Sequence, residues 1–382
     1  MRSCTSSDAR DNAGSAWACR VCRAKVFALI IKLVNSKRHW LASVSAMVAI
    51  LIVACSSPPE RTSPKFTGRL LLLTGDPSTG AALAELTQAG EGYNLTTLTA
   101  GVKEAVASPD RARLLFATKD EISLRDLASG SVTALVKGES ACLAWAPDGN
   151  HFSYQQKSGN STKLFVADVA GKSKLVLDDP NGTTDCANWI ANDRLVLDRF
   201  AGLMTKKGAE TLKPNTSTVA TIGDPVKLKD GPRKWSIETV CAKSKEGFVR
   251  SADQNALLIA KNMDRFESLD PSPAPCSECR FIGYAAQSCA PFFIEQPSST
   301  TTELFFLNPT NWQKQRPTSI TWTFANAKFL INSAARLMVA GDAPDKLLLI
   351  DTESGEVTPF FQDAKARGVA LVSPVPIVWI EK

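Results

Sequence analysis

Short hydrophobic runs separated by polar turns recur along the chain at nearly constant spacing. Each repeat holds two runs, and the second run ends in Asp or Asn. The paired runs are FSYQQ (152–156) with KLFVAD (163–168), FFIEQ (292–296) with ELFFLN (303–308), LLFA (114–117) with ISLRD (122–126), and LMVA (337–340) with LLLID (347–351). Runs of this length between Asp-Gly, Ser-Gly and Asn-Gly turns indicate β-strands. Each repeat therefore predicts a hairpin followed by a third short strand.

The period of the repeat predicts the architecture. The first strand of each unit is expected to start near residues 70, 114, 152, 195, 247, 292 and 337, at intervals of about 38 to 52 residues. This is the period of a four-stranded propeller blade, and blades placed around an axis cover most of their sheet edges. We therefore expect an all-β fold, a β-propeller of seven four-stranded blades, with six or eight blades as the alternatives.

The two ends of the repeat region predict how the ring closes. Residues 368–374, GVALVSP, match an innermost strand and its turn, whereas no equivalent precedes GRLLLL at 68–73. The C-terminal strand is therefore predicted to complete the first blade, so that strands from both ends close the ring.

Two long segments interrupt the repeat between Arg199 and Cys289, where its pattern is weak. They are expected to be long loops, from Met204 to Pro225 and from Asn262 to Pro275. Insertions in repeat proteins gather where binding occurs. These two segments are therefore the first candidates for a contact surface.

The turns before the strands carry a family resemblance. Ala107-Ser108-Pro109-Asp110 and Trp145-Ala146-Pro147-Asp148-Gly149 combine a Pro that presets a turn with an Asp or Asp-Gly that closes it. Together with the "Leu-Phe-Val-x-Asp" strand, this resembles the WD-like repeat of the TolB-like β-propeller family over about four units. The resemblance implies a cell-envelope protein that binds another envelope protein or a peptidoglycan-associated partner through loops on one face.

An apolar run from Trp40 to Ala54 is followed by Cys55 within the stretch LIVACSS. The run is shorter than a membrane-spanning helix, and its ending resembles a bacterial lipoprotein signal. This implies lipid attachment at Cys55, and Ser56 in the next position implies the outer membrane. The predicted organisation is a signal region at 1–54, with 1–32 as a candidate mis-assigned start, a lipidated flexible tether at 55–65 and the propeller at 66–382.

Charge argues against a nucleic-acid partner. The first 54 residues hold eight of the 44 basic and two of the 38 acidic residues, so 36 of each remain after them. A neutral surface lacks the cations that neutralise phosphates. We therefore expect no nucleic-acid binding, membrane contact through the lipid anchor at Cys55, an unidentified envelope protein as partner and a monomeric propeller.

Histidine content restricts the chemistry. The chain has 2 histidines, and His151 is the one that follows Cys55. A Ser or Cys nucleophile needs a base and an orienting acid, and the sequence has no Gly-x-Ser-x-Gly elbow. We predict no catalytic, cofactor or metal-binding residues, and a structural or solvated role for His151. Asp126, Asp168 and Asp351 recur at equivalent positions, which predicts that they bond turn amides.

Six cysteines follow Cys55, and an even number in an exported protein favours disulfides. The candidate disulfide residues are Cys142, Cys186, Cys241, Cys276, Cys279 and Cys289. Cys142 and Cys186 each stand three residues before a Trp, which places them at the same level of neighbouring innermost strands and favours that pair. The other four are expected to staple the irregular blades.

Two function classes remain open. The first is a lipid-anchored, non-enzymatic propeller that binds a protein partner or acts as a scaffold. The alternative is a propeller enzyme or ligand-binding protein that acts on an envelope glycan or a small molecule through its central channel. Carboxylates and exposed aromatic residues clustered in the channel would favour the alternative, whereas a rimmed hydrophobic patch on one face would favour the first.

Overall fold

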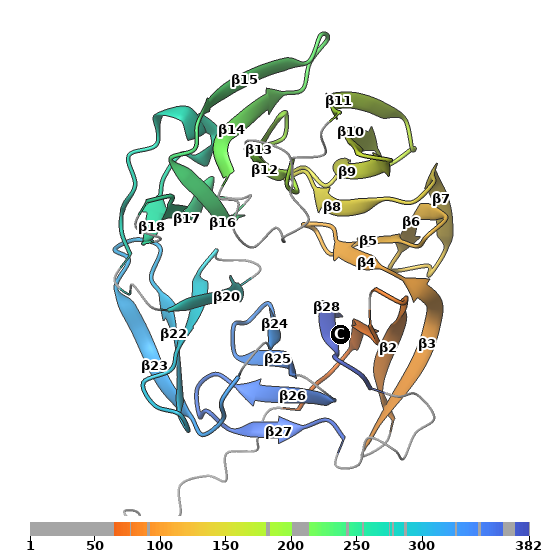
Figure 1. Ribbon diagram of the computed structural model, residues 1–382. Helices are drawn as coiled ribbons and strands as arrows, with labels where there is room; N and C mark the ends of the chain where they lie inside the picture. Colours follow the sequence, from red (N-terminus) through yellow and green to blue (C-terminus); the bar gives the residue numbers. More distant parts are fainter. Residues whose placement is uncertain are drawn as a thin grey trace, which may run out of the picture. The chain divides into compact units, whose positions relative to one another are not determined.

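Seven four-stranded antiparallel sheets form the blades of a ring (Figure 1). The structure is a computed structural model that describes residues 65–381 except 77, 90–91, 181–183, 201–213, 242–243, 254–255, 275, 277–278, 286–288, 325–326, 343–344 and 362–370. The expectation of an all-β propeller with seven blades is confirmed. The predicted signal region and Cys55 lie outside the described residues. No helix in the described part of the chain is long and apolar enough to cross a bilayer.

Every blade runs from an innermost strand next to the central axis to an outermost strand on the rim. In that order, blade 1 contains β28 (Val375–Ile380), β1 (Arg69–Thr74), β2 (Ala81–Ala89) and β3 (Gly92–Val102); blade 2 contains β4 (Glu104–Ala107), β5 (Arg113–Ala117), β6 (Glu121–Asp126) and β7 (Val132–Lys137); blade 3 contains β8 (Ala141–Trp145), β9 (His151–Ser158), β10 (Ser161–Asp168) and β11 (Ser173–Asp179). Blade 4 contains β12 (Asn188–Ala191), β13 (Arg194–Phe200), β14 (Pro214–Thr221) and β15 (Lys227–Pro232); blade 5 contains β16 (Trp235–Cys241), β17 (Glu246–Ser251), β18 (Leu257–Ala260) and β19 (Ser272–Pro273). Blade 6 contains β20 (Arg280–Tyr284), β21 (Pro291–Glu295), β22 (Thr302–Leu307) and β23 (Lys314–Ile320); blade 7 contains β24 (Lys328–Ile331), β25 (Leu337–Asp342), β26 (Lys346–Asp351) and β27 (Val357–Pro359). The strands that the repeat predicts to come first are the second strands of the blades, and each starts within one residue of its predicted position.

Burial on both faces explains why the second strands are continuous apolar runs. In β1, Leu70 and Leu72 join the apolar cluster between blades 7 and 1, whereas Leu71 and Leu73 join the cluster between blades 1 and 2. Successive strand residues point to opposite faces, so a strand between two blades needs apolar residues at every position. Seven such clusters, one at each blade interface, make up the core.

The repeated aspartates bond turn amides, as predicted. Asp126 Oδ1 accepts hydrogen bonds from the amides of Ala128 and Ser129 at 3.1 and 2.7 Å. Asp168 Oδ1 accepts from Ala170 and Lys172, and Asp351 Oδ1 accepts from Glu353 and Ser354. Because the third strand of each of these blades ends in such a carboxylate, the turn to the fourth strand is fixed locally.

The C-terminal strand completes blade 1, as expected, but it is not the segment that the sequence suggested. The innermost strand is β28, and residues 371–374 precede it without forming a strand. Ser373 has a positive φ of 44°, and Val372 exchanges hydrogen bonds with Thr74 and Gly75. The Ser-Pro pair therefore introduces the innermost strand, whereas the sequence pattern predicts the turn that follows one.

The two predicted insertions contain more regular structure than expected. Pro214–Thr221 forms strand β14, and the segment after Asn262 forms a 3₁₀-helix, η2 (Met263–Ser268), followed by β19. The prediction of loops there was wrong because β14 is rich in Ser and Thr, so that it lacks an apolar run. Residues 201–213 lie outside the described part of the chain.

The six cysteines form three disulfides. Cys142 and Cys186, with Cα atoms 5.2 Å apart, join β8 of blade 3 to the segment that leads into blade 4. Cys241 and Cys289, with Cα atoms 6.0 Å apart, join β16 of blade 5 to the segment after β20 of blade 6. The third bond, Cys276–Cys279, closes a short loop before β20. Two of the three therefore link neighbouring blades.

Candidate functional site

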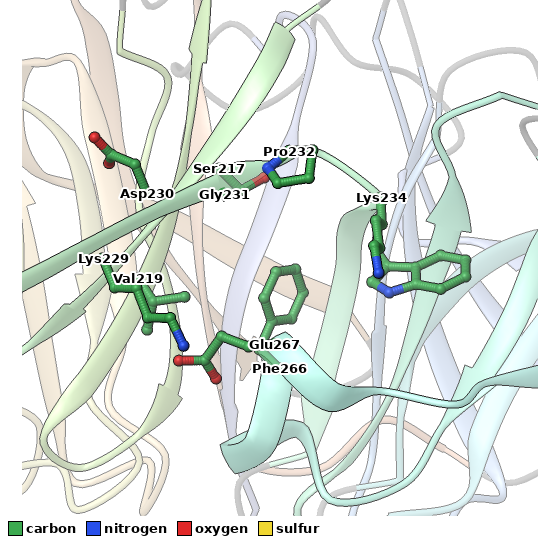
Figure 2. Close-up of a pocket in the computed structure, with 10 residues that line it drawn as sticks. Ser217, Val219, Lys229, Asp230, Gly231, Pro232, Lys234, Phe266 and Glu267 are labelled. Carbon is green, nitrogen blue, oxygen red and sulfur yellow. The ribbon is translucent and has the colours of Figure 1, made fainter.

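A cleft of 320 Å³ opens between blades 4 and 5 (Figure 2). We call it the inter-blade cleft, and it is lined by Ser217, Val219, Lys229, Asp230, Gly231, Pro232, Lys234, Trp235, Phe266 and Glu267. One wall comes from β14 and β15, and the other comes from the start of β16 and from η2. The cleft therefore brings together parts of the two segments that interrupt the repeat.

The outermost strands of blades 4 and 5 differ in length. In blade 4 the outermost strand, β15, has 6 residues, whereas its counterpart in blade 5, β19, has 2. η2 is kinked at Arg265, whose backbone angles are not helical, between Met263 and Phe266. Both are buried, and they pack against Val219 of β14. β15 is therefore longer than its counterpart in blade 5.

Arg194 fixes η2 to blade 4. Its Nη2 donates to both carboxylate oxygens of Glu267 at 2.7 and 2.8 Å, and its Nη1 donates to the carbonyl of Asp264. Partial burial alone would raise the pKa of Glu267, but the hydrogen bonds and the charges of Arg194 and Lys229 lower it below the ordinary value. Glu267 is therefore ionised near neutral pH and already paired within the protein.

The other carboxylate of the cleft is also engaged. Asp230 accepts a hydrogen bond from Thr218 Oγ1 at 2.5 Å and lies 3.5 Å from Arg199. Lys229 faces Glu267 across the cleft (Figure 2), while Lys234 has no carboxylate within 4.0 Å among the described residues. The lining therefore holds two lysines and two carboxylates. Both carboxylates already have an arginine partner within the protein, so the lysine amines are the charged groups that a ligand would meet.

Two further pockets border other blade interfaces. One, of 510 Å³, lies on the other side of η2 and is lined by residues of blades 3, 4 and 5, including Arg194, Lys245 and Asp264. Lys245 and Asp264 form an ion pair at 3.1 Å across it. The other, of 140 Å³, is mostly apolar and lies between blades 6 and 7. Among the described residues, no group of three or more His, Cys, Asp or Glu side chains is placed to hold a metal ion.

His151 takes part in a turn. Its Nδ1 lies 3.0 Å from Asp148 Oδ2, and Asp148 Oδ1 accepts from the amides of Asn150 and His151. Partial burial would raise the pKa of Asp148, yet these hydrogen bonds and the His151 ring lower it. The imidazole thus belongs to the turn between β8 and β9.

The innermost strands carry two carboxylates, each with a partner inside the protein. Glu238 on β16 accepts from Arg250 at 2.5 Å, and Glu104 on β4 accepts from the Leu143 amide at 3.1 Å. Burial raises the pKa of Glu104, although hydrogen bonds from the Leu143 and Cys142 amides oppose the rise. Glu104 therefore connects blade 2 to the strand of blade 3 that holds the Cys142–Cys186 disulfide.

We predict that Glu104→Gln raises the melting temperature at pH 7 and that this gain shrinks as the pH falls to 4. A carboxyl group with a raised pKa in the folded chain contributes full stability below its unfolded pKa of 4.5, and this contribution is lost as the pH rises through the folded pKa. Glutamine removes the buried charge and keeps one acceptor. Thermal unfolding of both proteins across this pH range tests the prediction, and a pH-independent difference would contradict it.

The interruptions of the sequence repeat predict part of the cleft. The two interrupting segments supply Ser217, Val219, Phe266 and Glu267. The sequence pattern does not predict the cleft residues between these segments, from Lys229 to Trp235, because a polar strand next to a Trp has no distinct motif. The alternation of Lys227 and Lys229 around Leu228 was the available signal for an exposed edge strand.

Comparisons with known proteins identify the fold. No protein-family model matches the chain, and no curated protein is found to be similar to it. Among solved structures, a functionally unknown protein from Desulfotomaculum acetoxidans aligns over 81% of this chain and 99% of its own, with 10% identity and a TM-score of 0.53. The tricorn protease aligns over 83% of this chain and 36% of its own, with 8% identity and a TM-score of 0.50.

TolB from Acinetobacter baumannii is also among the structural neighbours. It aligns over 86% of this chain and 70% of its own, with 12% identity and a TM-score of 0.43. This TM-score carries no argument about the present chain. The seven four-stranded blades themselves define the class of the protein as a seven-bladed β-propeller, and a shared fold does not establish an activity.

Proposed function

We propose that the chain is a lipid-anchored β-propeller of the bacterial cell envelope that binds another envelope protein and is not an enzyme. The inter-blade cleft is the proposed contact surface. The observation that carries this proposal is the meeting of the two interrupting segments at one cleft with aromatic side chains and lysines. Propeller blades are otherwise regular, so a departure from the repeat that creates a cleft favours binding at that place.

The cleft has the composition of a protein contact. Trp235 is only partly buried, and Phe266 and Val219 lie beside it at the same interface. Aromatic side chains at the centre of a contact commonly supply most of the binding energy, while charged groups around them steer the partner. Trp235 is the proposed anchor of the contact, and Lys229 and Lys234 are its charged rim.

The anchor and the family relation are proposed on the sequence. Residues 51–57 support lipid attachment at Cys55, and the turn motifs before the strands support a relation to TolB-like propellers. Two acyl chains hold a protein stably at a membrane, whereas one chain does not. Attachment at Cys55 would keep the propeller close to an envelope partner.

Cross-linking in native membranes, followed by affinity purification and mass spectrometry, tests the proposal. Wild-type protein should enrich a reproducible partner, and Cys55→Ser should lose it because the propeller leaves the membrane. Trp235→Ala should reduce the captured partner by about tenfold or more, the usual effect of removing a Trp hot spot.

Trp145→Ala is the matched control for the cleft variant. Trp145 is also partly buried on an innermost strand, and it donates to the Val106 carbonyl at 3.1 Å, so its replacement removes comparable aromatic packing away from the cleft. Equal loss of the partner in both Trp variants would assign the effect to stability. Undiminished capture of the partner by a folded Trp235→Ala variant would show that the cleft is not the contact surface.

A further inference from the structure

Among the described residues, no strand pairs with the outer edge of β15, which lies beside the inter-blade cleft. β15 pairs with β14 from Lys227↔Thr221 to Pro232↔Thr216, and it is the last strand of its sheet. Figure 1 shows it on the outer rim of the ring. In an antiparallel sheet, alternate residues of an edge strand turn their backbone N–H and C=O groups away from the sheet. β15 therefore presents backbone donors and acceptors that an extended segment can pair with.

The two faces of β15 differ in character. Lys229 and Gly231 line the inter-blade cleft on the blade 5 side, with Val219 and Ser217 opposite them on β14. Because strand residues two apart share a face, Lys227 lies on this face as well. Leu228, which is 45% exposed, lies on the other face. Asp230, which is bonded to Thr218 and lies near Arg199, shares the face of Leu228. A strand added to this edge would thus meet lysines on its cleft side, and Leu228 beside the already paired Asp230 on its other side.

Gly231 leaves room in the cleft. A Cβ atom placed on Gly231 would meet nothing within 4 Å, and its φ is not positive. The absent side chain exposes the space in front of Trp235 and Phe266. A large side chain from an added strand can enter there, while Pro232, which has no N–H, ends the edge.

Charge decides which kind of segment fits. Arg194 and Arg199 pair with the cleft carboxylates. Among the described residues, Lys227 and Lys234 have no carboxylate within 4.0 Å, and Lys229 faces Glu267, whose charge Arg194 already offsets. Opposite charges at directly facing positions of neighbouring strands stabilise pairing, and like charges oppose it. A second copy of this chain pairing through β15 would bring lysines together, so a copy of the same strand is disfavoured.

We infer that an extended acidic segment of the partner protein adds to β15 as a fifth strand of blade 4, with an aromatic or large apolar side chain over Gly231. This inference rests on the proposed function, and it specifies which kind of partner segment binds at the same cleft. Strand addition draws affinity from main-chain hydrogen bonds and specificity from alternate side chains. Acidic side chains face Lys227 and Lys229, and an apolar side chain faces Leu228.

Binding of a fluorescent peptide to the propeller tests the inference directly. The probe is a nine-residue peptide that alternates Glu and Val around one central Phe, and its binding to the full chain carrying Cys55→Ser is followed by anisotropy. The same peptide with Lys in place of Glu should bind at least about tenfold more weakly, because two or more cross-strand charge pairs are reversed. A version with alternate backbone amides N-methylated should lose binding, because it cannot form the ladder.

Two variants locate the site on β15. Lys227→Glu combined with Lys229→Glu should exchange the preference, so that the Lys peptide binds more tightly than the Glu peptide. Lysines that serve only to prevent edge aggregation would not produce this exchange. Gly231→Val should weaken the Glu peptide by about tenfold while keeping the fold, because β-branched residues suit strands. Lys119→Glu combined with Lys157→Glu, on exposed lysines of blades 2 and 3, is the control and should change nothing.

The outcomes of these experiments distinguish failure of the strand-addition inference from failure of the proposed function. Absent binding of the Glu peptide, or binding insensitive to N-methylation or to Gly231→Val, overturns strand addition. If partner capture still depends on Trp235 in that case, the cleft stands and only the extended acidic segment is rejected. If capture does not depend on the cleft either, both proposals fail. A dimer in light scattering that Gly231→Val dissociates would assign the edge to a second copy and would also overturn the inference.

Discussion

Deletion of residues 368–382 is expected to abolish cooperative unfolding of the whole propeller. The deletion removes β28, so the inner edge of β1 loses its pairing from Arg69 to Leu73. It also removes Trp379, which is 2% exposed, stacks on Phe66 with ring centroids 4.9 Å apart and donates to the Thr67 carbonyl at 2.8 Å. Burying each large apolar side chain contributes about 1.5–3 kcal/mol, and the strand carries several.

The expected loss in the free energy of unfolding is comparable to the whole stability of an ordinary domain, about 5–15 kcal/mol. The apolar clusters on both sides of blade 1 are opened together, because Val378 belongs to one and Trp379 to the other. Circular dichroism and Trp fluorescence during heating measure the result. Adding residues 368–382 as a separate peptide should restore a cooperative unfolding transition. A truncated protein that melts at the wild-type temperature would show that the ring does not depend on β28.

Replacement of Cys142 and Cys186 by Ser is expected to lower the free energy of unfolding by about 2–4 kcal/mol. The bond spans 44 residues, and the chain-entropy relation gives about 4 kcal/mol for a loop of this size. Cys241 and Cys289 span 48 residues and should behave alike. Both bonds connect neighbouring blades, so their removal frees the unfolded chain and loosens a blade interface. Urea denaturation of the two double variants measures these losses.

The chain supplies its own control for this prediction. Cys276 and Cys279 are separated by 3 residues, and so short a loop restricts the unfolded chain by less than about 2 kcal/mol. Their replacement should therefore cost clearly less than replacement of either inter-blade pair. Equal losses from all three pairs would show that loop closure is not the source of the stabilisation.

The sequence predicts the second strands of the blades with high accuracy because these strands are buried on both faces. LLLL at 70–73 and LLFA at 114–117 stand out as apolar runs, and their spacing leads directly to seven blades. The innermost strands are harder to find. β4, β12 and β24 have 4 residues each, and their sequences EAVA, NWIA and KFLI show no shared pattern. This is also why the closing strand was placed several residues too early.

The cleft depends on contacts that a linear pattern does not contain. Sequence interruptions pointed to its neighbourhood, but the pairing of Arg194 with Glu267 joins residues 73 positions apart and fixes η2 against blade 4. The shortness of β19 relative to β15 depends on how far each strand continues along its neighbour. Strand length in a polar segment is decided by tertiary pairing and is only weakly specified by propensity.

Site-specific photo-cross-linking in native membranes tests the central claim most directly. A photoreactive residue replaces Lys234 at the inter-blade cleft in one protein and exposed Lys157 on blade 3 in another. The account predicts one defined cross-linked protein from position 234, none from position 157, and loss of the product when Cys55→Ser is added. Equal products from both positions, or a defined product from position 157 alone, would contradict the assignment of partner binding to the cleft between blades 4 and 5.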